Sequence, residues 1–284
     1  MPNSTDLSQS QSQQAPMKPT VDFYEPLPNV YDEALLPSGA AREHWSFTLN
    51  SLKGLGSDNL AARESKTQRI LRDDGATYKS YTDRERTWDL DTVPLIIDSD
   101  KWAHIEAGIL QRSELFNRLF NDIYGPQELI RQGIIPPEVV FSHPGFLRPC
   151  FGIKQPSEHA LILHGIDLVR TSDDKICVIG DRTQAPSGAG YALENRTVMS
   201  RVFPSLFRES QVQRLAMFFQ TLRVKLNNLS PDDYLPNIVV MTPGSSSESY
   251  FEHAYLANYL GYSLVQGRDL TAVSYTQFRS HVTP

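Results

Sequence analysis

The spacing of hydrophobic residues predicts several helices along the chain. The clearest one begins at Asp98 or Ser99 and ends at Gly125-Pro126, because the apolar residues between these points recur at helical spacings. Its apolar stripe consists of Trp102, Ile105, Ile109, Phe116, Leu119 and Ile123. Further helices are expected from a Ser38 N-cap to Gly54 or Gly56, over residues 58–72, 127–132 and 191–202, and over an amphipathic segment from Val212 to Leu226.

Strands are predicted where apolar residues alternate or form short continuous runs. Residues 160–169 and 176–179 flank the turn Ser172-Asp173-Asp174, and we expect them to form a hairpin. The run from Leu90 to Ile97 is interrupted by Pro94, which is typical of an edge strand, since proline cannot donate a ladder hydrogen bond.

A β-α-β unit is predicted over residues 238–265. The apolar run 238–241 is followed by a polar loop, by a helix from Glu248 to Tyr259, and by a second strand at 263–265. In open α/β sheets, ligands bind at the carboxyl end of such a strand. The expected fold class is therefore α/β, with α+β as the alternative, and the expected architecture is a mixed sheet with flanking helices.

The composition is typical of a globular chain. Of the 284 residues, 40% are hydrophobic and 21% are charged, which excludes a wholly disordered, collagen-like or coiled-coil protein. Residues 1–20 are rich in Ser, Gln and Pro, so we expect a disordered tail there. A mainly helical region over 21–150 and an α/β region over 151–284 are expected to follow.

Charge and hydropathy exclude some partners. With 33 acidic against 27 basic side chains the net charge is −6, so the basic footprint of a nucleic-acid-binding protein is missing. The sequence has neither a run of about 18 apolar residues nor a signal core, which predicts a soluble, cytoplasmic protein without a membrane partner. Cys150 and Cys177 lack the spacing of a zinc site and are expected to be core thiols. The oligomeric state stays open.

Polar chemistry is concentrated between residues 181 and 196, where charged side chains surround a glycine-rich helix start. The backbone N–H groups at Ser187 and Gly188, together with the helix dipole, favour an anion. Arg182 and Arg196 can hold a phosphate or carboxylate in bidentate fashion. The alternative is a glycine-rich turn in which these arginines pair with acidic residues of the same segment.

Other polar residues allow two interpretations. Arg112 interrupts the apolar stripe of the helix over 98–125, so either its guanidinium reaches solvent or it points into a ligand cleft. Glu248 follows a serine-rich loop, where an acidic residue also complements a helix dipole without any ligand. Asp167 and Arg170 are either surface charges or site residues.

Five motifs carry a resemblance to a known family. They are Tyr31-Asp32-Glu33, Asp122-Ile123-Tyr124-Gly125, HPGFLRPC at 143–150, DRTQAPSGAGYALENR at 181–196 and YFEHAYLA at 250–257. With these motifs the chain resembles bacterial circularly permuted ATP-grasp proteins of type 2, which are distantly similar to glutathionylspermidine synthase. The resemblance implies a ligase that uses ATP and magnesium. It would join a small-molecule or peptide carboxylate to an amine through an acyl phosphate.

The resemblance and the residue chemistry together define a candidate site. As catalytic residues, Arg182 and Arg196 are expected to neutralise an acyl phosphate. The expected ligands of the substrate or phosphate are Arg148, Gln184, Ser187, Gly188, Asn195 and Glu248. Asp181 is the candidate metal ligand, although ligases of the glutathionylspermidine type place an acidic residue and an asparagine where this chain has Gly180-Asp181-Arg182.

The nucleotide clamp is expected to be incomplete in this chain. Phosphoryl transfer depends on charge neutralisation around the phosphates, and no lysine follows Lys225. We therefore expect a truncated ATP-grasp architecture that holds the substrate side of a ligase and is inactive by itself. The alternative is a non-catalytic module that binds an anion or peptide, or acts as a scaffold, on a degenerate ATP-grasp fold.

Overall fold

Helices dominate the computed structural model, which describes residues 24, 26–79, 85–155, 157–230 and 236–270. The eight α-helices of this part are α1 (Glu43–Asp73), α2 (Ser99–Ile123), α3 (Glu128–Arg131), α4 (Pro137–Phe141), α5 (Ala189–Val202), α6 (Pro204–Glu209), α7 (Ala216–Asn227) and α8 (Tyr250–Leu260). Two 3-10 turns are η1 (Arg148–Cys150) and η2 (Gly267–Asp269). The predicted tail, residues 1–20, lies outside the described residues.

The strands of the described residues form three two-stranded sheets. They are β1 (Thr77–Lys79), β2 (Glu85–Thr87), β3 (Gly165–Arg170), β4 (Ile176–Arg182), β5 (Val239–Met241) and β6 (Ser263–Val265). The β1–β2 and β3–β4 pairs are antiparallel, and the β5–β6 pair is parallel. The predicted mixture of helices and strands is confirmed. The three sheets stay separate in the described part, where the expected edge strand at 90–97 is irregular and pairs with no other strand.

The hairpin and the β-α-β unit are confirmed, with shifted bounds. Residues 160–164 stay outside β3, whereas β4 extends to Arg182, so the polar segment begins on a strand. In the second unit α8 connects β5 to β6, and it ends at Gly261 with φ 74°, a left-handed conformation that glycine adopts without strain. Cys177, expected as a core thiol, is exposed on β4, as are its neighbours Val178 and Ile179, so the middle of this strand is not covered by other described elements.

The sequence predicted the presence of most helices correctly but placed several of their ends wrongly. The expected break at Gly56 is present as a kink, where φ is 74° inside α1. The predicted Ser38 N-cap is wrong, since α1 begins at Glu43 after a segment in which Leu35 and Ala41 form an isolated β-bridge. The start at Val212 is also wrong. The positive φ of Gln211, 49°, separates α6 from α7, and α6 was not predicted.

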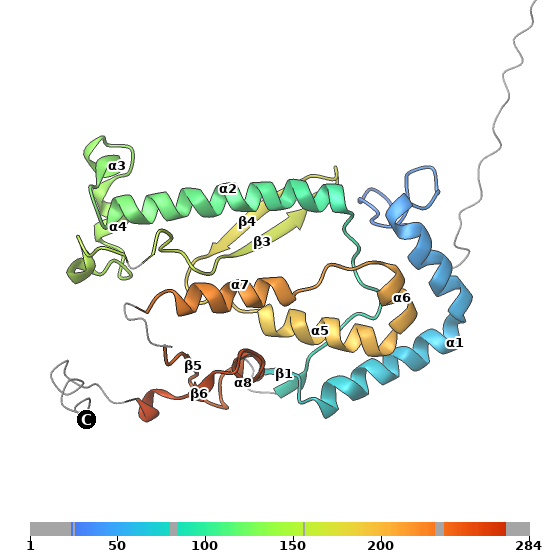
Figure 1. The fold of residues 1–284 in the computed structure, drawn as a ribbon. Coiled ribbons are helices and arrows are strands. Elements are labelled where there is room, and N and C mark those ends of the chain that lie inside the picture. The colour runs from blue at the N-terminus through green and yellow to red at the C-terminus, as the bar shows by residue number, and fades with distance from the viewer. Residues whose placement is uncertain (1–23, 25, 80–84, 156, 231–235, 271–284) are drawn as a thin grey trace, which may run out of the picture.

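The core joins α1 to α5. Figure 1 shows α2 along one side with the β3–β4 hairpin against it, and α5 lying between α1, α7 and α8. One cluster of buried residues consists of Leu52, Leu71, Ala76, Val198, Met199, Val202 and Phe203. It contains residues from both sides of position 150, where the domain boundary stays a prediction. None of the helices in the described part has the length and apolar character needed to cross a membrane.

Candidate functional site

An internal carboxylate occupies the N-terminus of α5. Glu252 of α8 is only 2% exposed, and its Oε1 accepts hydrogen bonds from the backbone N–H groups of Gly188 (2.6 Å) and Gly190 (2.9 Å). A Cβ at Gly190 would lie 2.7 Å from Glu252 Cγ, so glycine permits this approach. The expectation of an available Gly188 amide is therefore corrected. The negative charge that the helix start attracts is supplied by a side chain of the protein itself.

The loop between β5 and α8 contacts His253, the neighbour of Glu252. Thr242 Oγ1 accepts a hydrogen bond from Gly244 N (3.2 Å) and lies 3.0 Å from Nδ1 of His253. Glu252 and His253 thus have different partners, as expected for adjacent helical positions. Glu248 is exposed. Burial, followed by the charges of Glu252 and Glu248, raises the pKa of Tyr191 to about 12, so Glu248 lies close enough to act on the first turn of α5.

The two arginines of the polar segment have different environments. Arg182, whose side chain is 60% exposed, pairs with Asp167, and Nη2 lies 3.0 Å from Oδ2. Arg196 is partly buried on α5, where burial lowers its pKa, and no described residue is its hydrogen-bond or ion-pair partner. The alternative in which both arginines pair inside the segment is therefore wrong for the described residues. Their catalytic roles stay predictions.

The contacts of the remaining predicted ligands in this segment do not bring them together at one site. Asn195 Oδ1 accepts a hydrogen bond from Trp88 Nε1 (2.9 Å), which ties α5 to the end of the β1–β2 hairpin. Gln184 and Ser187 are exposed in the loop that precedes α5. Their ligand roles also stay predictions.

Asp181 belongs to an ion-pair cluster between α2 and β4. Arg112 donates to both carboxylate oxygens, from Nε at 2.6 Å and from Nη2 at 2.5 Å. His164 Nε2 lies 3.1 Å from Oδ1 of Asp181, and Ser113 Oγ lies 2.8 Å from the other ring nitrogen. The Arg112 hydrogen bond is the main reason why the pKa of Asp181 is below its ordinary value. The side chain of Arg112 is 38% exposed, so it reaches solvent as one interpretation expected, but it is also held by Asp181, a partner that neither interpretation included.

This arrangement does not suit a magnesium ion. A bidentate arginine occupies the oxygen atoms that a hard cation would need, and its charge repels a second cation. Among the described residues, no group of three or more His, Cys, Asp or Glu side chains could hold a metal ion. The described residues therefore do not fit the metal site predicted at Asp181.

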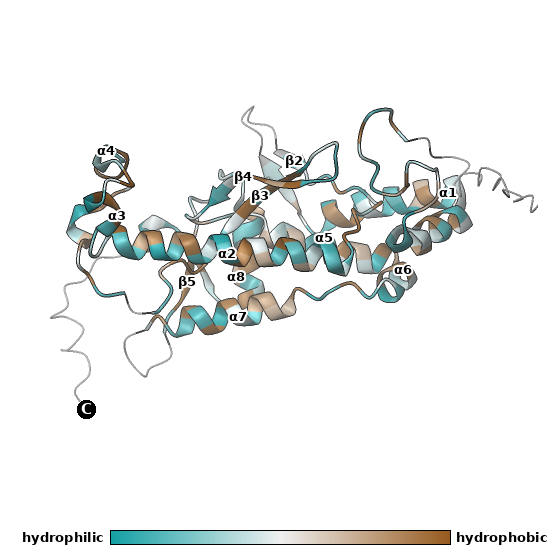
Figure 2. Cartoon of the chain, turned by 90° about the horizontal axis from the view of Figure 1, so that it is seen from above, coloured by the Kyte–Doolittle hydropathy of each residue, from teal (hydrophilic) through white to brown (hydrophobic). Residues whose placement is uncertain are grey.

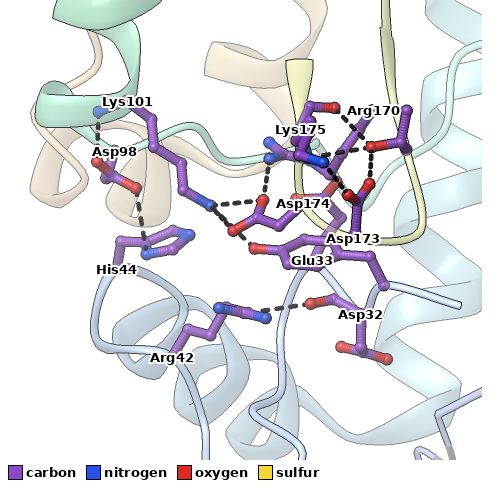
Figure 3. Close-up of polar contacts among 12 residues, drawn as sticks. Asp32, Glu33, Arg42, His44, Asp98, Lys101, Arg170, Asp173, Asp174 and Lys175 are labelled. Carbon is purple, nitrogen blue, oxygen red and sulfur yellow. Dashed lines mark hydrogen bonds and ion pairs between the residues drawn. The ribbon is translucent and has the colours of Figure 1, made fainter. Parts of the chain in front are cut away.

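A second polar network contains the Tyr31-Asp32-Glu33 motif, to which sequence reasoning gave no role (Figure 3). Glu33 Oε1 accepts a hydrogen bond from Arg170 Nε (2.5 Å), and Arg170 Nη1 also donates to Asp174 (2.5 Å). The Arg170 side chain is 12% exposed, so its interpretation as a surface charge is wrong. Desolvation alone would lower the pKa of this arginine, but the two carboxylates hold it above its ordinary value.

Tyr31 lies at the centre of this network. Lys101 Nζ donates to the Tyr31 hydroxyl (2.9 Å) and to Asp174 (3.2 Å). The cationic groups of Arg42, Lys101 and Arg170 lie 4.4, 5.2 and 4.9 Å from the centroid of the Tyr31 ring, within cation–π range. Tyr31 and Glu33 thus contact Lys101 of α2 and Arg170 of β3, so the network fixes the N-terminal segment to α2 and to the hairpin. The motif itself was the only sequence signal for it.

Arg148 lies apart from the other predicted ligands. It lines a cavity of about 260 Å³ together with Gln127, Phe141, Phe146 and Phe151. These residues belong to the α3–α4 end of α2, whereas the polar segment runs from the end of β4 into α5, beside α8 (Figure 1). The structure therefore provides two regions where sequence reasoning expected one cleft.

Comparison with known proteins assigns the chain to one family. The family model for circularly permuted ATP-grasp type 2 proteins matches residues 94–281. An uncharacterized protein of Mycobacterium tuberculosis is 37% identical over 253 residues, which cover 84% of this chain and 28% of that protein. An uncharacterized protein of Synechocystis sp. is 37% identical over 257 residues, covering 89% and 53%. The chain thus spans between about a quarter and about half of the length of these curated relatives.

Proposed function

Because the chain belongs to the circularly permuted ATP-grasp type 2 family, we propose that it is part of an ATP-dependent ligase that joins a carboxylate to an amine. The observation that carries this proposal is the family match over residues 94–281, which includes the β3–β4 hairpin, α5 and α8. The proposed substrates are small-molecule or peptide acids and amines, activated through an acyl phosphate. ATP and magnesium are the cofactors that the family implies, and a cytoplasmic location would supply both.

Arg196 is the residue proposed to bind the anionic group. A partly buried guanidinium without a described partner is desolvated, so an anion that binds to it gains more than it would at an exposed arginine. The group it would hold is the substrate carboxylate or the acyl phosphate. Arg182 would bind the same anionic group after releasing Asp167. Breaking this ion pair costs little, because the pair is exposed to solvent.

The described residues are proposed to serve the acid and amine, and no step is assigned to a metal ion held by Asp181. Arg112 neutralises that carboxylate and links α2 to the hairpin on which Arg182 stands. Residues outside the described part would then supply the ligands of magnesium and of the nucleotide phosphates.

A second candidate function is a non-catalytic module that binds an anion or a peptide. Two observations favour it: Glu252 fills the helix start where an anion was expected, and Arg112 holds the candidate metal ligand Asp181. Such a module would bind an anion at Arg196 without consuming ATP.

An acyl-phosphate trapping experiment separates the two functions. We would incubate purified 1–284, and any longer protein of which it is a part, with ATP, magnesium, pools of carboxylic acids and hydroxylamine, and measure ADP and hydroxamate. We expect no acid-dependent ADP from 1–284 alone and clear turnover once the nucleotide clamp is complete.

Arginine variants then test the site. Arg196→Gln in the active form is expected to lower kcat/KM by about 100-fold, the typical loss when a group that stabilises transition-state charge is removed. The matched control is Arg214→Gln, which removes the same charge at an exposed position. Absence of hydroxamate from every form of the protein that is tested would contradict the ligase and favour the binding module.

A further inference from the structure

The α3–α4 end of the molecule contains a cavity that the proposed ligase chemistry does not use. Three phenylalanine side chains, Phe141, Phe146 and Phe151, line it, and Arg148 and Gln127 supply its polar groups. Phe141 and Phe151 are 41% and 49% exposed, so the cavity is open to solvent. Figure 2 shows that apolar residues occur along α3 and α4, at this end of the molecule. An apolar cavity with a few converging polar groups is the usual form of a small-ligand site.

The wall of this cavity is fixed in place by Tyr124, at the C-terminus of α2. The Tyr124 hydroxyl accepts a hydrogen bond from Leu147 N (2.9 Å), and its carbonyl accepts one from Gly152 N (2.8 Å). Its ring stacks on Phe146, with centroids 5.1 Å apart, and Phe146 meets Phe141 edge to face at 5.2 Å. The loop that carries Arg148 is thus held at both sides, so the cavity is largely formed before any ligand binds.

Arg148 gives the cavity its charge. In the part of the chain that the structure describes, its guanidinium has neither an ion-pair nor a hydrogen-bond partner, and no carboxylate lines the cavity. The other polar lining residue, Gln127, uses its side-chain N–H to donate to the carbonyl of Ile123 (3.1 Å). One uncompensated positive charge beside aromatic rings matches a ligand with one negative charge and an apolar body.

We propose that this cavity binds a monocarboxylate that carries an aromatic or similarly sized apolar group. The planar fork of Arg148 suits a carboxylate, and a single cation balances a single negative charge better than the two charges of a phosphate ester. The volume of about 260 Å³ is below the usual range for drug-sized ligands, so the apolar group is a single ring or one amino-acid side chain.

Such a ligand can be a free acid or the C-terminal residue of a peptide, because both present the same carboxylate and side chain. The proposal does not depend on ATP chemistry, since the proposed ligase reaction gives no role to any residue of this cavity; Arg148, expected from the sequence to bind substrate, lies here, away from α5 and α8. It therefore stands or fails independently of the trapping experiment.

Ligand titration by calorimetry and ligand-observed NMR tests the proposal with defined probes. The free acid is 3-phenylpropionate, the chain-end analogue is N-acetyl-phenylalanine, the neutral control is 3-phenylpropanamide, and the dianionic control is phenyl phosphate. The protein variants are Arg148→Gln and the matched Arg118→Gln. Arg118 lies on α2, is 77% exposed and pairs with Glu114 outside the cavity. Thermal unfolding by circular dichroism establishes that each variant is folded.

We expect a carboxylate probe to bind saturably. The neutral amide is expected to bind about tenfold or more weakly than the carboxylates, and the carboxylates are expected to bind Arg148→Gln about tenfold or more weakly than the unchanged protein. Their affinity for Arg118→Gln is expected to be unchanged. Tighter binding of N-acetyl-phenylalanine than of 3-phenylpropionate would identify a peptide C-terminus as the source, and the reverse order a free acid. The proposal is overturned if neither carboxylate binds saturably, if the amide binds equally well, if Arg148→Gln has no effect, or if phenyl phosphate binds more tightly than both acids.

Discussion

Replacing Glu252 tests whether its carboxylate stabilises the junction of α5 and α8. Two backbone N–H groups donate to Oε1 at 2.6 and 2.9 Å, and the residue is 2% exposed. Hydrogen bonds to a charged group contribute about 1.5–3 kcal/mol each, so the pair is worth about 3–6 kcal/mol before desolvation is considered. Burial of the charge offsets part of this, because Oε2 has no hydrogen-bond partner among the described residues. We expect Glu252→Ala to lower the free energy of unfolding by about 3 kcal/mol.

Two further variants separate charge from packing. Glu252→Gln keeps an oxygen acceptor of the same size but loses the attraction between the carboxylate and the helix dipole, which is worth about 0.3–2 kcal/mol. It also buries an amide N–H₂ where Oε2 has no partner, so we expect a loss of about 1–2 kcal/mol. Glu248→Gln removes the same charge at an exposed position nearby and is expected to change stability by less than about 0.5 kcal/mol.

Urea unfolding followed by circular dichroism measures these differences, with the slopes compared to check that each variant unfolds from a similar native state. The expected order of destabilisation is Glu252→Ala, then Glu252→Gln, then Glu248→Gln. If Glu252→Ala proves no less stable than Glu248→Gln, the carboxylate does not stabilise this helix start.

Three other outcomes follow from the same contacts. Gly190→Ala is expected to lower the free energy of unfolding by about 1–3 kcal/mol, because the added Cβ would clash with Glu252. Gly108→Ala, in open space on α2, is expected to raise it by about 0.5–1 kcal/mol. Equal melting temperatures of the two variants would refute the close contact of Gly190 with Glu252. Burial raises the pKa of Glu194 above its ordinary value of 4.5, so the stability that this residue contributes is lost as pH rises through the folded pKa. Above that pH, Glu194→Gln should be more stable than the unchanged protein in urea unfolding. Parallel pH profiles of the two proteins would contradict this. The Arg112 hydrogen bond lowers the pKa of Asp181 from 3.8, so the stability that this ion pair contributes is present above pH 3.8 and is lost as pH falls through the folded pKa. Asp181→Asn should therefore make the free energy of unfolding less dependent on pH in the acid range. An unchanged pH dependence would show that the ion pair contributes nothing.

Local patterns in the sequence determined most of the elements. The stripe from Trp102 to Ile123 predicted α2, and Asp98 caps it by accepting a hydrogen bond from Lys101 N (2.8 Å). The turn at 172–174 predicted the hairpin, and Gly261 ends α8 as expected. These features depend on residues a few positions apart, so the spacing of residue types is sufficient to predict them.

Only the tertiary structure decided the partners of the polar residues. Glu252 is 62 positions from Gly190, and Arg112 is 69 positions from Asp181, so no spacing rule connects them. A helix start attracts negative charge and an aspartate attracts positive charge, but neither preference tells whether a ligand or a distant side chain satisfies it. The sequence therefore determined where charge is needed, and the packing of α8 and α2 decided that the protein supplies it at these two positions. At Arg148 and Arg196, by contrast, no described residue does so.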